Sequence, residues 1–365
     1  MTRDAGGLPP LRIATVGFQG FDNVGDEAIL SGIEVVISTT DARVSTVFSG
    51  PRPEGIVAFA DARRVVAWRH LPGPSALRAL RRVDLLILAG GGIFNDHWTA
   101  VIPRYLSWVL AARLAGAKIA WVGVGVGPIR RRSLRWLARV AARASTLVLV
   151  RDAASAKLLS NGRVRVIPDP SIFNPTPGSG AHRAELGLIV REPSSSDAAR
   201  RTELIDALAS AAATAAARGV RPVILTMAGN IDRPVVDAVL AACERAGLPD
   251  VRCEALGPTP EAAIERLASL SGLVTVRLHG LLLGALAGVP TVPIAYDDKV
   301  RVAADRLGLG DLVVPLAGAS AADLLDRLDD AASDERRTAV RTRLEALRSE
   351  RDDVAAAVMA IGRRR

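Results

Sequence analysis

Cysteine, aromatic side chains and long uncharged apolar runs are all scarce in this sequence of 365 residues. Its two cysteines, Cys243 and Cys253, match no metal motif and make no disulfide framework, so we expect a reducing, cytoplasmic setting. Aromatic residues form 4% of the chain, too few for base-stacking platforms, which argues against a nucleic-acid partner. No apolar stretch of about 18 residues is free of charge, and residues 1–10 lack the apolar core of a signal peptide. No membrane span is therefore predicted.

Several common catalytic patterns are also absent. The sequence contains no GxSxG, HExxH, Walker A or CxxC motif, which argues against a serine hydrolase, a zinc protease and a P-loop ATPase. No cluster of His, Asp and Glu has the spacing of an obvious metal site, so we expect no metal. The glycines after the first apolar run do not form GxGxxG, and no ribose-binding acid follows them, so NAD is weakly supported as a ligand.

Apolar residues and arginine dominate what is present. Hydrophobic residues make up 49% of the chain, enough for large cores, and the length is typical of about two domains. The net charge is +9, and nearly all of the cations are arginines. Such a balance favours anionic partners, which include phosphorylated metabolites, acidic glycans and a membrane surface.

Short apolar runs alternate with amphipathic segments along the chain, a pattern typical of parallel, doubly wound sheets. The alternation fills residues 1–173, stops in a Pro-, Gly- and Ser-rich segment at 174–182, and restarts over 183–320. Residues 321–365 are expected to form charged helices. The pattern therefore predicts an α/β protein of two Rossmann-like domains that face a cleft, with the segment at 174–182 as their linker.

The most informative polar residues lie in the second half. Arg277 and His279 follow one short apolar run, and Tyr296 and Lys299 follow the next. Such runs are typical of buried strands, and ligands bind at the strand ends of α/β sheets, so we expect these side chains to converge. Cations beside an imidazole suit an anionic substrate and a proton transfer. The alternative is a histidine that is bonded only to the backbone.

A glycine-rich turn follows the first predicted strand and contains Asn23, Gly25 and Asp26. Glycine in such a turn lets a ligand approach the backbone closely. The alternative is that Asn23 or Asp26 caps the helix that follows, because side-chain oxygens at this position accept from free helix amides. Both interpretations stay open on the sequence alone.

A second glycine-rich segment follows the apolar run that we expect to end at Ala89. Gly90, Gly91 and Gly92 are predicted to form a turn after the strand, and Asn95 follows them. The amides of such a turn can cradle a phosphate or a sugar oxygen. A plain strand-to-helix turn is the alternative.

Arginines also follow two other apolar runs. Arg191 directly follows the run at 186–190, where a guanidinium can clamp a carboxylate or a phosphate with two hydrogen bonds. A solvated arginine is the alternative. Arg151 and Asp152 are interpreted as a surface ion pair with a helix cap, and Asp169 as a turn residue.

The segment 130–143 carries six arginines and is predicted to be largely helical. A solvated helix face is the usual role of such a segment. The alternative is peripheral contact with anionic lipid headgroups at the inner face of a membrane, where the lipid-linked intermediates of glycan assembly lie.

Seven blocks occur in one order over roughly residues 11–310: GFQGFDNVGDEAIL, LILAGGGIFND, GVGVGPI, VRDAASAKLL, IPDPSIF, LIVRE and TVRLHGLLLGALAGVPTVPIAYDDKV. Together they resemble the polysaccharide pyruvyl transferase family of bacterial cell-wall and exopolysaccharide pyruvylation enzymes. The resemblance implies a fold similar to GT-B glycosyltransferases. It also implies that pyruvate is transferred from phosphoenolpyruvate (PEP) onto a sugar as a cyclic ketal, with no further cofactor.

The resemblance also implies residue roles. The family's catalytic histidine matches His279, its anion-binding arginines match Arg277 and Arg191, and Lys299 occupies the position of the family's lysine. The matching motifs of the first half, which are expected to serve the sugar acceptor, contain Gly25, Asp26, Gly90, Gly91 and Gly92. Asp26 is a candidate base for the acceptor hydroxyl. The sequence departs from the family at Gln19, where an aromatic residue is common, and at Gly280, where alanine is common.

Two other functions remain as alternatives. A GT-B glycosyltransferase that uses a nucleotide sugar would need a ribose-binding carboxylate in the second half, and none of Glu254, Glu261 and Glu265 is convincing in that role. An inactive protein that binds glycan or lipid phosphate is the other alternative. The Arg-Leu-His triplet that ends at His279 speaks against it, as does Lys299. The acceptor sugar, its lipid linkage and the oligomeric state cannot be read from the sequence.

Overall fold

The computed structural model describes residues 10–51, 65–67, 71–160, 162–178, 183–192, 198–295, 297–317 and 319–362. The chain divides into two compact units. Unit 1 comprises Met1–Phe21, Ile29–Pro170 and Glu350–Arg365, and unit 2 comprises Asp22–Ala28 and Ser171–Ser349. Each half of the sequence thus contributes most of one unit, but a short segment of the first half belongs to unit 2, and the C-terminal residues belong to unit 1.

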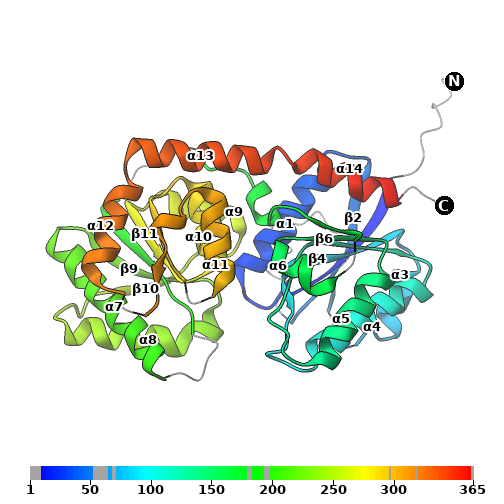
Figure 1. Ribbon diagram of the computed structural model, residues 1–365, viewed down its shortest axis with the longest axis horizontal. Coiled ribbons are helices and arrows are strands. Elements are labelled where there is room, and N and C mark those ends of the chain that lie inside the picture. The colour runs from blue at the N-terminus through cyan, green and yellow to red at the C-terminus, as the bar shows by residue number, and fades with distance from the viewer. Residues whose placement is uncertain are drawn as a thin grey trace. The chain divides into compact units, whose positions relative to one another are not determined.

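Unit 1 is built on a parallel sheet whose described strands number seven, in the order β3-β2-β1-β4-β5-β6-β7 (Figure 1). The strands are β1 (Leu11–Val16), β2 (Ala42–Ser49), β3 (Val65–Ala67), β4 (Leu85–Phe94), β5 (Lys118–Val126), β6 (Leu147–Val150) and β7 (Val164–Val166). The helices are α1 (Val24–Ser38), which begins in unit 2, α3 (Pro74–Leu80), α4 (Val101–Leu114), α5 (Arg132–Ala144), α6 (Ala153–Leu159) and α14 (Arg351–Gly362).

Unit 2 repeats the arrangement with a parallel sheet of six described strands, in the order β10-β9-β8-β11-β12-β13. The strands are β8 (Glu185–Ile189), β9 (Arg221–Thr226), β10 (Arg252–Ala255), β11 (Gly272–Thr275), β12 (Thr291–Ala295) and β13 (Val314–Pro315). The helices are α7 (Ala198–Ala217), α8 (Gly229–Arg245), α9 (Pro260–Ala268), α10 (Leu278–Ala287), α11 (Asp298–Leu307), α12 (Ala321–Ala331) and α13 (Asp334–Arg348). Both orders are those of the Rossmann fold, so the predicted pair of doubly wound domains is confirmed.

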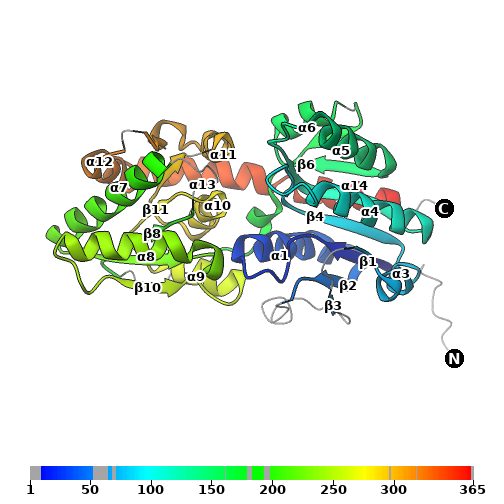
Figure 2. The ribbon, with the colours of Figure 1, turned by 90° about the horizontal axis from the view of Figure 1, so that it is seen from below.

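The scarce aromatic residues are concentrated in the core of unit 1. Phe48 packs on Trp108 with ring centroids 4.5 Å apart, and Phe94 stacks on Trp121 at 4.3 Å. All four side chains are fully buried, together with Tyr105 of α4. Because a large ring buries far more surface than an alanine or valine, these residues fill the space between the sheet and the pair α4 and α5. The two helices lie side by side in both views (Figures 1 and 2).

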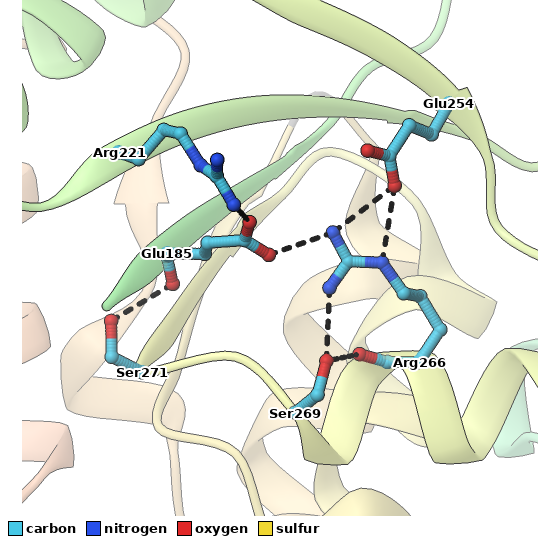
Figure 3. A network of polar contacts seen from close by, with 6 residues as sticks. All are labelled: Glu185, Arg221, Glu254, Arg266, Ser269 and Ser271. Carbon is cyan, nitrogen blue, oxygen red and sulfur yellow. Dashed lines mark hydrogen bonds and ion pairs between the residues drawn. The ribbon is translucent and has the colours of Figure 1, made fainter. Parts of the chain in front are cut away.

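A network of charged side chains in unit 2 joins the amino ends of β8 and β9 to β10 and α9 (Figure 3). Glu185, whose side chain is almost fully buried, accepts hydrogen bonds from Arg221 and, at 2.9 Å, from Arg266. Arg266 also donates to Glu254 at 3.2 Å, and Ser271 donates to the Glu185 carbonyl at 2.8 Å. Burial by itself would raise the pKa of Glu185, but the bond from Arg221 and the charge of Arg266 outweigh it and lower the pKa.

Two predicted boundaries are wrong. β4 does not end at Ala89 but continues to Phe94, because its pairing with β5 resumes at Gly91 and Phe94 after an irregularity. The sequence predicts a helix over 234–246 that starts at Pro234, because proline is common at helix starts, but α8 begins at Gly229 and Pro234 lies inside it. No helix among the described residues is long and apolar enough to cross a bilayer.

Candidate functional site

Polar side chains gather at the carboxyl edge of the unit 2 sheet, where the strand order reverses between β8 and β11. Arg191 lies two residues beyond the end of β8, and Arg277 lies two residues beyond the end of β11. These strands are neighbours, and such a reversal point is where open α/β sheets bind ligands. The topology therefore places Arg191 and Arg277 at one edge of the sheet.

The Arg277 guanidinium is held by Asp232, a residue of α8. Nη2 of Arg277 lies 2.5 Å from each carboxylate oxygen of Asp232, and its Nε donates to the Val190 carbonyl at 3.4 Å. Asp232 is fully buried and also accepts from the amide of Ala228 at 3.3 Å. Burial raises the pKa of Asp232, and the charge of Arg277 offsets this only in part. The arginine is thus fixed by a carboxylate that has no solvent exposure.

Lys299 and Arg191 surround a second carboxylate of the same edge. Asp297 caps α11 by accepting from the Lys299 amide at 3.2 Å, and its carboxylate lies 2.9 Å from Nζ of Lys299. Burial alone would raise the pKa of Asp297, but the charge and the hydrogen bond of Lys299 lower it, and the charge of Arg191 adds to this. Arg191 also acts on Asp232. The three cations and two carboxylates leave a net charge of one positive.

His279 lies in the first turn of α10 and contacts Gly25 from the first half of the sequence. A Cβ atom placed on Gly25 would lie 2.6 Å from Cγ of His279 and closer still to Nδ1. Only glycine therefore lets the backbone at position 25 lie against the imidazole. α10 has no acidic residue in its first turn, so the positive end of its dipole lies beside His279.

Gly280 places α10 directly on the sheet. A Cβ atom at this position would overlap Oγ1 of Thr275 and lie 3.1 Å from Cδ1 of Ile189. Oγ1 of Thr275 in turn accepts from the Arg277 amide at 3.1 Å. The close approach of α10 to Thr275 and Ile189 explains why this sequence has glycine at position 280, where alanine is common in the family that it resembles.

The segment Asp22–Ala28 is anchored within unit 2. The amide of Val24 donates to the Met227 carbonyl at 3.0 Å, just beyond β9. Asn174 donates its side-chain amide to the Ala28 carbonyl at 2.8 Å. These bonds hold the start of α1 beside α10, although the two are separated by some 250 residues of sequence.

Asn23 caps α1, and its side chain also bonds to Asp26. The side-chain oxygen of Asn23 accepts from the Gly25 amide at 3.3 Å, and its carbonyl accepts from the amide of Asp26 at 3.0 Å. The Asn23 side-chain amide donates to the buried carboxylate of Asp26. Capping and a place beside His279 are thus compatible for this turn.

The glycines at 90–92 lie in unit 1 and do not form the predicted turn. Gly90, Gly91 and Gly92 belong to β4, which remains paired with β5, and Gly91 has a positive φ of 82°. Gly90 and Gly91 are buried, whereas Gly92 is exposed. Asn95 donates to the Gly92 carbonyl at 2.6 Å and accepts from the His97 amide at 3.1 Å. The side chain of Asn95 therefore closes the loop after β4.

Arg151 is buried in unit 1, so the predicted surface ion pair is wrong in its placement. Its Nη1 lies 3.1 Å from the Asp169 carboxylate, and its guanidinium lies against Gly125 of β5. Asp152 caps α6, as predicted, by accepting from the Ser155 amide at 2.7 Å. Asp169 is therefore an ion-pair partner rather than a turn residue alone.

Tyr296 lies outside the described residues. Asp232 was not predicted as a site residue, because a helix that starts at Pro234 would leave it in a loop. Its position shortly after the end of β9 is the sequence feature that indicates a site residue here. Within the described ranges, no group of three or more His, Cys, Asp or Glu side chains is placed to hold a metal ion.

Comparison with known proteins identifies a family. The family model described as polysaccharide pyruvyl transferase matches residues 23–298, which is more than half of the chain. The matched range begins at the turn beside His279 and ends next to Lys299. A search of curated proteins found no match.

Solved structures show the same fold at low sequence identity. A putative UDP-N-acetylglucosamine 2-epimerase from Listeria monocytogenes has a TM-score of 0.61 at 10% identity, covering 96% of this chain and 95% of its own. A glycosyltransferase from Rickettsia africae has a TM-score of 0.58 at 12% identity, covering 96% and 98%. UDP-GlcNAc 2-epimerase from Neisseria meningitidis, bound to UDP-GlcNAc, has a TM-score of 0.55 at 12% identity, covering 92% and 99%.

Proposed function

Because the chain belongs to the polysaccharide pyruvyl transferase family, we propose that it transfers pyruvate from PEP onto a sugar and forms a cyclic ketal. The sugar belongs to a surface polysaccharide or to its lipid-linked precursor. We place the reaction in the cytoplasm, at the inner face of the membrane. The observation that carries the proposal is the gathering of Arg191, Arg277, Lys299 and His279 on unit 2.

The cations account for donor binding. PEP carries a phosphate and a carboxylate, and guanidinium groups suit both because they donate two parallel hydrogen bonds. Arg277, fixed by Asp232, and Arg191 on the adjacent strand end supply such groups, and Lys299 supplies a point charge. The amides at the start of α10 favour an anion at the same edge. No further cofactor enters this proposal.

His279 supplies the proton that starts the reaction. It protonates the methylene carbon of PEP, and C2 becomes electrophilic as the double bond is lost. One sugar hydroxyl attacks C2 and loses its proton, the C2–O bond to phosphate breaks, and a second hydroxyl attacks C2 to close the ketal. Of the two hydroxyl protons, one replaces the proton given to the methyl carbon and the other ends on the phosphate. The arginines stabilise the leaving phosphate.

The acceptor is proposed to involve the first half of the sequence. Asp26 is the candidate base for the acceptor hydroxyl, since its turn contacts His279 through Gly25. Asn23 bonds to Asp26 and sets the position of its carboxylate. Further acceptor contacts are proposed from Gly90, Gly91 and Gly92 of β4, from Asn95 directly after it and from Tyr296.

The proposal is tested by thermal-shift titration with PEP beside UDP- and GDP-sugars. We expect selective stabilisation by PEP, and its loss in Lys299→Gln, whose target side chain is half-buried at this edge. Lys157→Gln is the matched control, because it removes the same charge from an exposed position of α6 in unit 1. Stabilisation by a nucleotide sugar alone would refute the PEP donor.

A glycosyltransferase that uses a nucleotide sugar is the second candidate. The likeness to structures that include an epimerase bound to UDP-GlcNAc favours it, because the fold is shared over most of both chains. Release of inorganic phosphate from PEP in the presence of an acceptor extract separates the two, since a glycosyltransferase releases a nucleoside diphosphate instead.

A further inference from the structure

The outer faces of α4 and α5 form one continuous surface of unit 1, called here the α4–α5 face. The helices lie side by side in both views (Figures 1 and 2). Nη1 of Arg113, in the last turn of α4, donates to the carbonyl of Ala144 at the end of α5 at 3.3 Å. The inner faces of both helices pack on the core of unit 1 through residues such as Trp108 and Ala138. Their outer faces are therefore presented together.

Large apolar side chains protrude from this face. Leu114 is 87% exposed and Leu110 is 45% exposed on α4, while Trp136 is 60% exposed on α5. Leu110 and Leu114 are four residues apart and share one side of their helix. A single exposed apolar residue is ordinary, but three large ones on two helices that pack together are typical of an interaction surface.

The surrounding charge is of one sign. The sequence from His97 to Arg151 contains no Asp or Glu, although Asp96 and Asp152 stand directly outside it. The same segment contains ten basic residues: Arg104, Arg113, Lys118, Arg130, Arg131, Arg132, Arg135, Arg139, Arg143 and Arg151. Arg151 is buried against Asp169, but Arg113, Arg130, Arg131, Arg132 and Arg143 are exposed on the two helices or directly before α5, so the α4–α5 face is basic.

The arginines at the start of α5 lie at the positive end of the helix dipole. Arg131 is the N-cap and Arg132 the first residue of the helix, and the first turn contains no acidic side chain. Cations at this end oppose the helix dipole and are unfavourable there. Both residues are exposed. The Asp96 carboxylate accepts hydrogen bonds from the amides of Arg130 and Arg131, so it offsets part of this repulsion.

We propose that the α4–α5 face binds the surface of a bilayer that contains anionic lipids. Arginines attract anionic headgroups, tryptophan prefers the headgroup level, and leucine enters the acyl boundary. A soluble polyanion would use the arginines but would leave Leu110 and Leu114 in water. The combination of charge and apolar side chains therefore favours a membrane. The inference does not depend on the PEP reaction, because the surface belongs to unit 1, whereas Arg191, Arg277, Lys299 and His279 belong to unit 2.

Sedimentation of the full chain with vesicles tests the proposal. We expect binding to phosphatidylcholine vesicles that contain phosphatidylglycerol, and loss of binding as salt screens the charges. Replacing Arg131, Arg132 and Arg143 together by Gln should weaken partition on the order of 100-fold, since each basic residue near such a surface contributes about 1 kcal/mol. Leu114→Ser should weaken it about tenfold.

The matched control changes the same charge elsewhere. Arg337, Arg341 and Arg343 are exposed on α13 of unit 2, and their joint replacement by Gln also lowers the net charge by three. We expect this variant to bind vesicles as the parent does. Equal weakening by both triple variants would overturn the proposal, because it would show that net charge rather than the α4–α5 face is responsible.

Tryptophan fluorescence provides the second measurement. Trp98 is 74% exposed and Trp136 60% exposed, whereas Trp108 and Trp121 are fully buried, so the contribution of the α4–α5 face is the quenching by brominated lipid that depends on Trp136. The quenching should fall in Trp136→Phe. Binding to DNA or to an acidic polysaccharide with no binding to anionic vesicles would overturn the proposal in favour of a polyanion.

Discussion

Replacing Asp232 by Asn separates two accounts of how the arginines bind an anion. On charge alone the variant should bind PEP more tightly, because the net charge of the three cations and two carboxylates rises from one positive to two. If Asp232 instead orients Arg277, the variant should bind more weakly. The geometry favours orientation, since one guanidinium nitrogen lies 2.5 Å from both carboxylate oxygens.

The magnitude follows from burial. Asp232 is fully buried and Arg277 is 8% exposed, so loss of one partner leaves the other without compensation in a desolvated place. Breaking such a pair costs about 3–5 kcal/mol of stability for Asp232→Ala. In Asp232→Asn the side chain keeps its shape and one hydrogen-bond acceptor. Hydrogen bonds to charged groups contribute about 1.5–3 kcal/mol, so we expect the variant to lose stability in that range. A freed Arg277 should raise the KM for PEP roughly tenfold or more, with a smaller change in kcat.

The assay combines thermal unfolding with a PEP titration on Asp232→Asn and Asp232→Glu. Asp237→Asn is the matched control, because it removes a carboxylate from the exposed side of the same helix, where Asp237 pairs with Arg233. We expect the control to behave as the parent and the Glu variant to restore part of the PEP affinity. Tighter PEP binding by Asp232→Asn would refute the orienting role. A loss of stability without any change in KM would reduce Asp232 to a structural residue.

Three other substitutions test close contacts and the charged network. Gly25→Ala forces a Cβ into the ring of His279, so we expect about 100-fold lower kcat/KM from a misplaced imidazole, measured by phosphate release. Gly280→Ala overlaps Oγ1 of Thr275, so we expect a lower melting temperature and lower activity together. Glu185→Gln should cost about 1.5–3 kcal/mol near neutral pH. The lowered pKa of Glu185 adds stability that is complete above the ordinary glutamate pKa and is lost as pH falls through the folded-state value.

Each of the three has an outcome that contradicts it. Gly73→Ala is the control for the glycines, because no atom lies within 4 Å of a Cβ at that position; equal losses in Gly73→Ala and Gly25→Ala would remove the argument from contact. Gly280→Ala with unchanged melting would show that α10 moves away from Thr275 at little cost. The denaturation free energy of the parent should fall more steeply with acid than that of Glu185→Gln, and parallel curves would contradict the assigned pKa shift.

Most of the two sheets was predictable from the sequence, because strands such as β1 and β5 are apolar stretches of strand length with an amphipathic segment after them. β10, with the sequence Arg-Cys-Glu-Ala, lacks this pattern. The placement of Arg277 and Lys299 was also predictable. Residues that directly follow buried strands must lie at the carboxyl edge, whatever else the fold does. The local sequence pattern was therefore sufficient for site residues that follow the ends of predicted strands.

Local pattern failed where a long-range contact decides the structure. Gly90, Gly91 and Gly92 suggest a turn, but hydrogen bonds to β5 keep them in the strand. Asp232 follows a strand as Arg277 does, but Pro234 disguised the start of its helix. Its buried pair with Arg277 joins residues 45 apart in sequence, and no single-segment pattern encodes that partnership.

The place of the first-half turn also bears on how the two halves divide the chemistry. The resemblance assigns Gly25 and Asp26 to the acceptor side and His279 to the donor side. In the structure all three belong to unit 2, where the bond from Val24 to Met227 and the contact of Gly25 with the imidazole hold them. An acid for PEP and a base for the sugar on one rigid edge would keep a fixed separation. If Asp26 is that base, Asp26→Asn should lower kcat while the affinity for PEP stays unchanged, and a loss of PEP affinity instead would place Asp26 on the donor side.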